Sequence, residues 1–246
     1  MKKKRISKVK ISNKLFDFKC RPAVKHVYAY LCTILGKKTK AGTMVRVRQK
    51  TIAARCRICK EETVSRIIDE LLEMGLIAKI IKTTYRSGKY GTYNYIIKPL
   101  SLDEGYFYVD RINFFGRFTS KQMLVYLFIC KSYDVEKRYC WNSYTDISNA
   151  LNIRRSEAIK IIAFLYLKHY ITKQHTRNKK NSRAFDDNIY SVIKLIDTIG
   201  FAKKACRFMS VKENTKKWFE FLIHIQFYSI FSRVQNRRSL YYPLLN

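Results

Sequence analysis

Two adjacent segments decide the fold of this chain: IAARCRI, from Ile52 to Ile58, and TVSRIIDELLEMGLI, from Thr63 to Ile77. In the first segment, small and apolar residues share one face of a short helix predicted over Gln49–Cys56. In the second, apolar residues recur every three or four positions, which predicts a longer helix over Glu62–Met74. Gly75 then suits the left-handed backbone position that ends many helices. The two segments therefore predict a pair of helices joined by a short turn.

The flanking residues extend this helix pair into a larger unit. Pro22 favours the first turn of a preceding helix, and Gly36 ends that helix. Thr43–Val47 alternates between apolar and polar residues, as a short strand does. Two β-prone runs follow, Leu76–Thr84 and Tyr90–Ile97, and the residues between them have turn chemistry. The predicted order is helix, strand, helix, helix and β-hairpin.

The same unit occurs a second time in the chain. Val27–Cys32 matches Val125–Cys130, 98 positions later. From Ile52 onward, apolar residues match a second set 95 positions later, and Tyr95 matches Tyr190 at the same spacing. This 95-residue register pairs Ile52 with Ile147, Ile58 with Ile153, Val64 with Ile159, Ile67 with Ile162, Leu72 with Leu167, and Leu76 with Ile171. The second copy is predicted from about Phe114 to Leu195, with helices over Ser120–Lys131 and Ser156–Tyr170, a turn motif over Thr145–Ile153, and a hairpin loop over His175–Phe185.

The charge of the chain indicates its class of partner. Its 246 residues include 50 Lys and Arg but only 18 Asp and Glu, which gives a net charge of +32. Such an excess indicates a polyanion or an anionic membrane as the partner. No stretch of about 18 residues is apolar and free of charge, and the N-terminus lacks the apolar core of a signal peptide. The 7 Cys are an odd number and are expected to be reduced thiols. We therefore expect a cytoplasmic protein that binds nucleic acid and no membrane.

The repeated order of elements is that of a winged helix–turn–helix. The two segments quoted above resemble bacterial winged-helix DNA-binding proteins, except that the turn before Thr63 is one residue longer than usual. We expect an α+β fold, mainly α with small β-hairpin wings, in two tandem winged helix–turn–helix domains. The expected divisions are a basic N-terminal arm (1–18) that includes Lys2, Lys3, Lys4, Arg5, Lys8 and Lys10, a first domain (19–100), a second domain (101–196) and a helical C-terminal extension (197–246).

Two winged helices in one basic chain resemble the replication initiators of plasmids and other mobile elements. The resemblance covers about residues 14–196. It implies sequence-specific binding of double-stranded DNA at origin repeats and recruitment of host replication proteins. A winged-helix transcriptional regulator is the nearest alternative, because it would use the same surface. A DNA-processing enzyme or an RNA-binding protein is a more distant one.

The second helix of each motif would face the major groove. Arg66 can bond the O6 and N7 atoms of guanine together, which makes the first copy a candidate reader of bases. In the 95-residue register, the second copy has Ile161 where the first has Arg66, and Phe164 and Leu165 follow at equivalent positions. Its helix is then apolar nearly all round, and such a helix is usually buried. We therefore expect the first copy to read bases and the second to bind the DNA backbone or hold the protein together.

The hairpin loops form a second basic surface, suited to phosphates or a minor groove. The residues expected to contact DNA are Lys60, Thr63, Ser65, Arg66, Lys82, Arg86 and Lys89 in the first copy, and Arg154, Arg155, Lys160, Arg177, Lys179, Lys180 and Arg183 in the second.

Catalysis finds little support in the sequence. The 4 His are scattered, and no Gly-rich phosphate loop is present. Cys56 and Cys59 form a single C-x-x-C pair, and a core position for Cys56 is favoured over a zinc site. We expect no enzymatic activity, no metal and no cofactor. A long apolar helix is predicted over Ser210–Arg233, and it would pack either within the chain on Ser156–Tyr170 or in a homodimer through residues 156–170 and 210–233.

Overall fold

The computed structural model of this chain describes residues 8–34, 36–84, 90–116, 118–177 and 185–193. These residues belong to one compact unit, Met1–Ile193, and a second unit, Lys194–Asn246, lies outside them. The helix predicted over Ser210–Arg233 therefore falls outside the described residues. Within the described part, the chain forms six α-helices and three small antiparallel sheets. The fold is thus α+β, as the sequence predicts.

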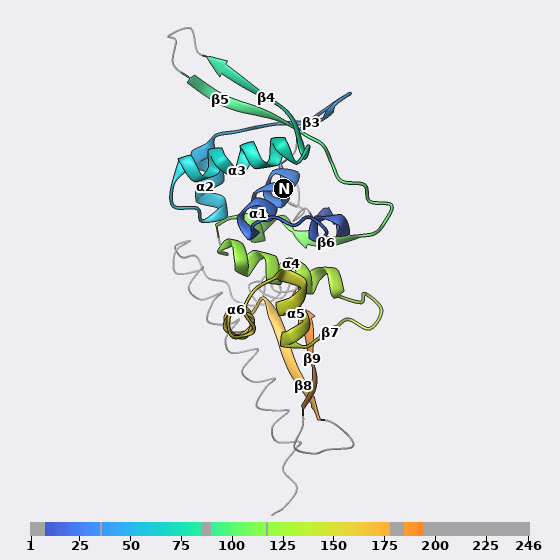
Figure 1. The fold of residues 1–246 in the computed structure, drawn as a ribbon. Coiled ribbons are helices and arrows are strands. Elements are labelled where there is room, and N and C mark those ends of the chain that lie inside the picture. Colours follow the sequence, from blue (N-terminus) through green and yellow to red (C-terminus); the bar gives the residue numbers. More distant parts are fainter. Residues whose placement is uncertain (1–7, 35, 85–89, 117, 178–184, 194–246) are drawn as a thin grey trace, which may run out of the picture. The chain divides into compact units, whose positions relative to one another are not determined.

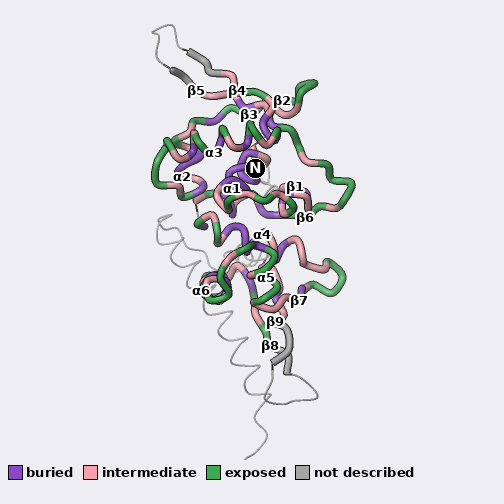
Figure 2. The backbone as a smooth tube through the Cα atoms, in the orientation of Figure 1, coloured by how far each residue is buried: buried purple, intermediate pink, exposed green. Residues whose placement is uncertain are grey.

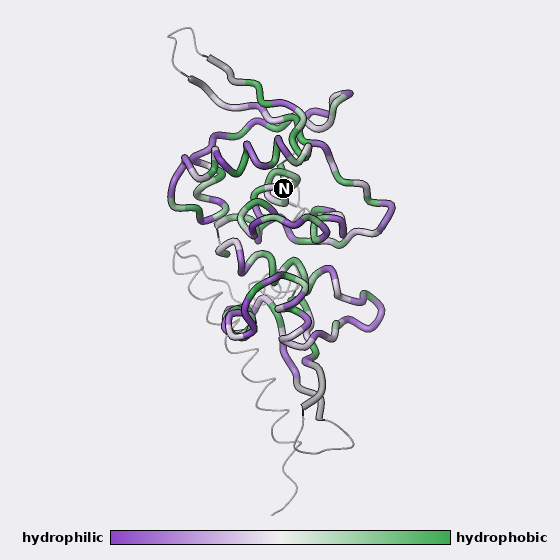
Figure 3. Tube along the Cα trace, in the orientation of Figure 1, coloured by the Kyte–Doolittle hydropathy of each residue, from purple (hydrophilic) through white to green (hydrophobic). Residues whose placement is uncertain are grey.

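The first series of elements follows the predicted order closely. In chain order its members are α1 (Pro22–Thr33), β2 (Lys37–Thr39), β3 (Gly42–Val47), α2 (Gln49–Cys56), α3 (Glu61–Glu73), β4 (Ile77–Thr84) and β5 (Tyr90–Ile97). The strands form one sheet in the order β2-β3-β5-β4. Helix α3 lies between α1 and the β4–β5 hairpin, and packs on both (Figure 1). Hydrophilic and hydrophobic residues alternate along α3, as expected for a helix with one buried face (Figure 3).

The second series repeats this architecture. Its members are α4 (Ser120–Ser132), β7 (Cys140–Asn142), α5 (Tyr144–Leu151), α6 (Arg155–Leu167), β8 (Ile171–Arg177) and β9 (Phe185–Val192). The sheet order β7-β9-β8 matches the order β3-β5-β4 of the first series. The registers also correspond, because Val45 pairs with Tyr95 and Cys140 pairs with Tyr190. Both tyrosines are fully buried.

A third, two-stranded sheet was not expected from the sequence. Strand β1 (Lys8–Ser12) pairs antiparallel with β6 (Tyr106–Asp110), and each is followed by a short 3-10 helix, η1 (Asn13–Phe16) and η2 (Arg111–Phe114). Residues 8–16 of the basic N-terminal arm expected over residues 1–18 are therefore part of the folded unit and not a separate arm. Ile11 and Leu15 are buried, and this burial holds the segment against the rest of the unit.

The two series correspond in a register that changes along the chain. Helices α2 and α5 are each eight residues long and start 95 positions apart, and each is followed by a left-handed residue, Arg57 at φ 52° and Asn152 at φ 49°. Helices α3 and α6 start only 94 positions apart. The turn before α3 is one residue longer than the turn before α6, in agreement with the long turn noted in the sequence. Through these helices the 95-residue register is therefore wrong by one position.

The corrected register changes the assignment of the outer face of α6. The counterpart of Arg66 is Lys160, and both are exposed. Over all 13 positions, α3 and α6 share the same sequence of buried, half-buried and exposed residues. Ile161 and Leu165 belong to the core, as their counterparts Ile67 and Leu71 do. The prediction that α6 is apolar on its outer face at these positions is wrong.

Helix α6 also ends earlier than predicted. It stops at Leu167 rather than Tyr170, because His169 adopts the left-handed conformation at φ 57°. The amide of Tyr170 then donates to the carbonyl of Leu165 at 2.9 Å, a bond that closes the helix end. In the first copy Gly75, at φ 69°, has the same place at the end of α3.

The core of the unit contains α1 and α4, whose side chains are largely buried (Figure 2). The two helices pack on each other, so the two series share a core. His26 lies in this contact, with its Nδ1 atom 3.4 Å from the hydroxyl of Ser120 and its ring 6.4 Å from that of Phe114. Burial lowers the pKa of His26 to about 3, which keeps the imidazole neutral near pH 7.

Candidate nucleic-acid interface

The exposed face of α3 carries more negative than positive charge. Its cations are Lys60, at the N-cap, and Arg66. Four carboxylates are exposed on the same helix: Glu61, Glu62, Asp69 and Glu73. A fifth, Glu70, forms an ion pair with Arg21, the N-cap residue of α1. Glu61 and Glu62 also occupy the first turn, where the helix dipole would otherwise favour a phosphate.

Thr63 and Ser65 lie on α3 but are only half-exposed. Their counterparts on α6 are Glu157 and Ile159, which are half-exposed as well. Arg66 and Lys160 are more exposed than these residues, as are the first-turn residues and the C-terminal ends of both helices. Of the residues predicted on α3, the structure brings Lys60 and Arg66 to the surface most fully.

The exposed face of α6 carries the opposite charge. Arg154 is its N-cap, Arg155 its first residue, and Lys160 follows one and a half turns later; all three are exposed. The only carboxylate of α6 is Glu157, and the ammonium group of Lys121 contacts its two oxygens at 2.7 and 2.8 Å. The N-terminal end of α6 therefore combines a helix dipole with cationic side chains, and it suits a phosphate.

A cluster around Tyr144 adds to this surface. The ring of Tyr144, in α5, lies 5.8 Å from the guanidinium carbon of Arg155 and 4.9 Å from the ammonium nitrogen of Lys173, in β8. Lys173 also donates a hydrogen bond to the hydroxyl of Tyr144. Sequence reasoning missed Tyr144 and Lys173, because only the tertiary fold brings α5, α6 and β8 together. We call Arg154, Arg155, Lys160, Lys173 and Tyr144 the α6 basic surface.

The hairpin residues are placed only in part. Lys82 lies in β4 and Arg177 in β8, but their side chains are outside the described structure. The other predicted hairpin residues, Arg86, Lys89, Lys179, Lys180 and Arg183, also fall outside the described residues. Their contact with DNA stays a prediction.

The C-x-x-C pair is split between core and surface. Cys56 is fully buried and burial raises the pKa of its thiol, whereas Cys59 is exposed. Among the described residues, no three His, Cys, Asp or Glu side chains gather as metal ligands would. The burial of Cys56 is the core position that the sequence favours.

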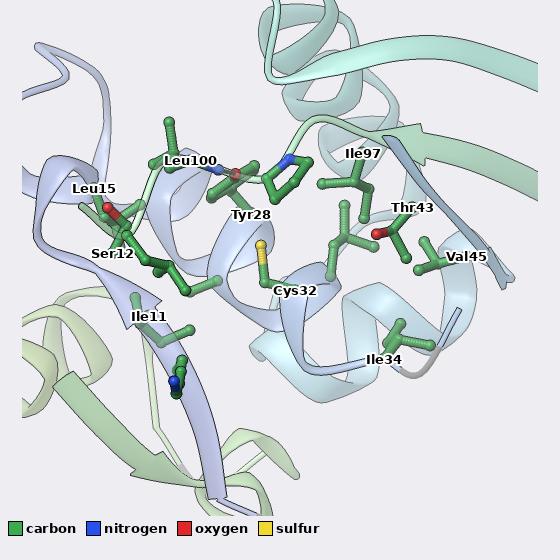
Figure 4. Close-up of a pocket in the computed structure, with 15 residues that line it drawn as sticks. Ile11, Ser12, Leu15, Tyr28, Cys32, Ile34, Thr43, Val45, Ile97 and Leu100 are labelled. Atoms are coloured by element: carbon green, nitrogen blue, oxygen red, sulfur yellow. Dashed lines mark hydrogen bonds between the residues drawn. The ribbon is translucent and has the colours of Figure 1, made fainter. Parts of the chain in front are cut away.

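One apolar cavity opens beside α1 (Figure 4). Its volume is about 160 Å³, and α1, β1, β3 and the segment after β5 supply its lining. Cys32 and Tyr28 face this space, and the loss of solvent raises the pKa of the Cys32 thiol to about 12. Tyr28 is held in place by donating to the carbonyl of Lys98 at 2.8 Å. A lining of this kind has no charged pair that could activate a nucleophile.

Comparison with known proteins finds a likeness among solved structures only. The sequence matches no protein-family profile and no curated protein. Solved structures that match it include a Pi initiator protein in complex with iteron DNA, which shares 15% sequence identity with this chain at a TM-score of 0.49. The match covers 77% of this chain and 98% of that chain. None of the helices in the described ranges has the length and apolar character needed to cross a membrane.

Proposed function

We propose that this chain is a non-enzymatic, sequence-specific double-stranded DNA-binding protein built from two winged helix–turn–helix modules. The repeated element order, the matching sheet orders and the left-handed residue after both α2 and α5 support this interpretation. In each module, the helix after that residue would enter the major groove, and the following hairpin would be the wing. The cellular role we propose is replication initiation on a plasmid or other mobile element, with host replication proteins as further partners.

The observation that carries the DNA-binding proposal is the α6 basic surface. At matched positions, α3 has Glu61, Asp69 and Glu73 where α6 has Arg155, Ala163 and Leu167. The same backbone arrangement is therefore acidic in the first copy and basic in the second. Because phosphate contacts supply much of the affinity for DNA, the electrostatic difference favours α6 as the helix that approaches the groove. This reverses the division of roles expected from the sequence.

The roles of individual residues follow from their positions. Arg154 and Arg155 stand at the N-terminal end of α6, the end that contacts bases in helix–turn–helix proteins. Either guanidinium can bond a guanine or a phosphate in a bidentate manner, and Lys160, about one and a half turns further on, adds a third exposed cation to the helix. The ring of Tyr144 restricts Arg155, which lowers the conformational entropy lost on binding. In the first module, the carboxylates exposed beside Arg66 would oppose a close approach to phosphates, so Lys60 and Arg66 would contribute less to binding.

Paired alanine variants test the proposal. A consensus duplex is first selected from a random library, and binding is then titrated at several salt concentrations. Arg154→Ala with Arg155→Ala should lower the magnitude of the salt slope by about 0.9 per lost phosphate contact, or about 2 in all. The matched control, Lys60→Ala with Arg66→Ala, removes the same number of charges and should lower it by less than about 1. If the control pair has the larger effect, the assignment to α6 is wrong, and if the parent protein binds no duplex, the DNA-binding proposal fails.

The selected sequence also separates the proposed role from its alternative. Several direct repeats of one site would favour replication initiation, whereas one inverted repeat would favour a transcriptional regulator. Incubation of supercoiled DNA with the protein and a divalent metal tests the non-enzymatic proposal, because nicking would contradict it.

A homodimer through residues 156–170 and 210–233 is a further part of the proposal. It has one support in the described residues: Tyr166 and Leu167 leave apolar surface exposed at the C-terminal end of α6. Replacing Phe221 and Ile225 by Asp should dissociate such a dimer, and sedimentation of the variant and the parent measures this. Equal masses for the two proteins would contradict a dimer held by these residues.

A further inference from the structure

The ribbon formed by β1 and β6 has two different faces. Phe107 and Val109 of β6 are buried and hold the ribbon against the core, together with Ile11 of β1. The alternate residues Tyr106 and Tyr108 point outward and are 42% and 51% exposed. Large aromatic side chains with this much exposure are not needed for the core, so the outer face requires another explanation.

The outer face combines the two tyrosines with lysines from β1. Lys10 pairs directly with Tyr108 across the ribbon, and its ammonium nitrogen lies 4.3 Å from the ring centroid of Tyr106 and 5.8 Å from that of Tyr108. The two rings are nearly perpendicular, at 88°, with centroids 5.5 Å apart. Lys8 is exposed two residues before Lys10 on the same strand. We call Lys8, Lys10, Tyr106 and Tyr108 the ribbon site.

The carboxylates near the ribbon site are engaged elsewhere. Glu104 forms an ion pair with Lys14 at 2.6 Å, and Asp103 accepts a hydrogen bond from the hydroxyl of Ser101 at 2.6 Å. Asp110, opposite Lys8 in the ribbon, is buried. The charge that the ribbon site presents to solvent is therefore positive.

We infer that the ribbon site binds single-stranded nucleic acid. An exposed aromatic ring can stack on a base only when the face of that base is free, and in a duplex both faces of each base are covered by its neighbours. Lysines beside such a ring would neutralise the phosphates that flank the stacked base. The ribbon site shares no residue with the α6 basic surface, so the chain has separate sites for unpaired and paired strands.

Direct binding of short oligonucleotides tests this inference. Fluorescence anisotropy measures the affinity of the protein for labelled 12-nucleotide strands of dT and of rU, so that single-stranded DNA and RNA are tested separately. Tyr106→Ala with Tyr108→Ala should weaken binding by roughly 5- to 150-fold per stacked base, with the salt slope unchanged. Lys8→Ala with Lys10→Ala should instead lower the magnitude of the salt slope by about 0.7 per lost contact. Tyr108→Phe keeps the ring and should bind as the parent does.

Two controls make the result specific. Trp141→Ala removes an aromatic residue that is 44% exposed but lies in β7, and it should leave single-strand affinity unchanged. Photo-crosslinking to a strand containing 5-iododeoxyuridine should label the peptide that contains Tyr106 and Tyr108. Equal loss in Trp141→Ala and the ribbon variants, or crosslinks only elsewhere, would overturn the inference.

The test of the ribbon site can be distinguished from the test of the proposed duplex binding. The ribbon variants should bind the selected duplex like the parent, and the Arg154→Ala with Arg155→Ala variant should bind dT like the parent. Parent protein that binds duplex but neither single strand would overturn the ribbon site alone.

Discussion

Two neighbouring residues of α6 test the register of the internal repeat. The side chain of Ile161 is only 6% exposed, and Ile161→Ala removes three carbon atoms from the core. At about 0.8 kcal/mol per buried carbon, the transfer cost is about 2.4 kcal/mol, and the cavity left behind places the total within about 2–5 kcal/mol. Lys160→Ala changes an exposed side chain and should alter stability by no more than about 0.5 kcal/mol. In the 95-residue register, Ile161 would face outward instead, and its truncation would cost little.

Urea unfolding followed by circular dichroism measures both variants against the parent. The first copy supplies a matched pair, because Ile67→Ala and Arg66→Ala occupy the equivalent positions of α3. Each isoleucine variant should lose stability to a similar degree, and each cation variant should not. The reasoning is refuted if Lys160→Ala loses as much stability as Ile161→Ala, because the buried and exposed positions would then be interchanged.

Three further predictions concern helix ends and the shared core. Ser143→Ala removes the capping box of α5 and should lower the free energy of unfolding by about 0.5–2 kcal/mol in a urea titration. The control is Arg48→Ala, at the N-cap of α2, where the side chain makes no capping hydrogen bond, and it should leave the free energy of unfolding unchanged. Gly75→Ala places a Cβ atom in open space, but at a backbone φ of 69°. Chemical denaturation should therefore show a loss of about 1 kcal/mol of stability that comes from backbone strain alone. An unchanged denaturation midpoint would contradict this. His26 has a pKa lowered to about 3 by burial, so the unfolded chain takes up its proton first as the pH falls below about 6.5. This group should therefore lower the free energy of unfolding by up to about 1.4 kcal/mol for each pH unit toward acid. Unfolding measured at pH 7 and at pH 4.5 should show a smaller decrease in His26→Gln than in the parent protein. Equal decreases in the two proteins would refute the assignment.

Elements with a strong local pattern could be predicted from the sequence. Helix α2 has the predicted bounds, and β5 has the bounds expected from its β-prone run. These segments have apolar residues at a clear period and are bounded by residues that end an element, so local information is sufficient. The element order of both series followed from the same signals.

The register of α6 could not be predicted in this way. Ile161 and Ile162 are adjacent and both apolar, so the run matches α3 almost equally well at either of two offsets. Which residue faces the core depends on where the helix starts, and the length of the preceding turn decides that. A one-residue error placed Ile161 on the outer face at the position of Arg66, and so led us to expect base reading by the first copy alone.

The ribbon site and the Tyr144 cluster were missed for another reason. Both are made by residues far apart in the chain. The alternation of Tyr106, Phe107, Tyr108 and Val109 is a signal that could have indicated an outward aromatic face. The partner strand, Lys8–Ser12, also alternates between polar and apolar residues, but no local feature shows that the two segments pair.

Pairing of β1 with β6 also affects how the chain folds during its synthesis. Lys8 is synthesised before its partner Asp110, which follows about a hundred residues later in the chain. At about 5–20 residues per second, the ribosome needs roughly 5–20 s to produce the second strand after the first. During that interval β1 exposes its apolar face and its unpaired backbone, which is the condition under which nascent chains aggregate or recruit chaperones. Lys8 and Lys10 give β1 a positive charge before it pairs with β6, and charge on an unpaired strand opposes association with another chain.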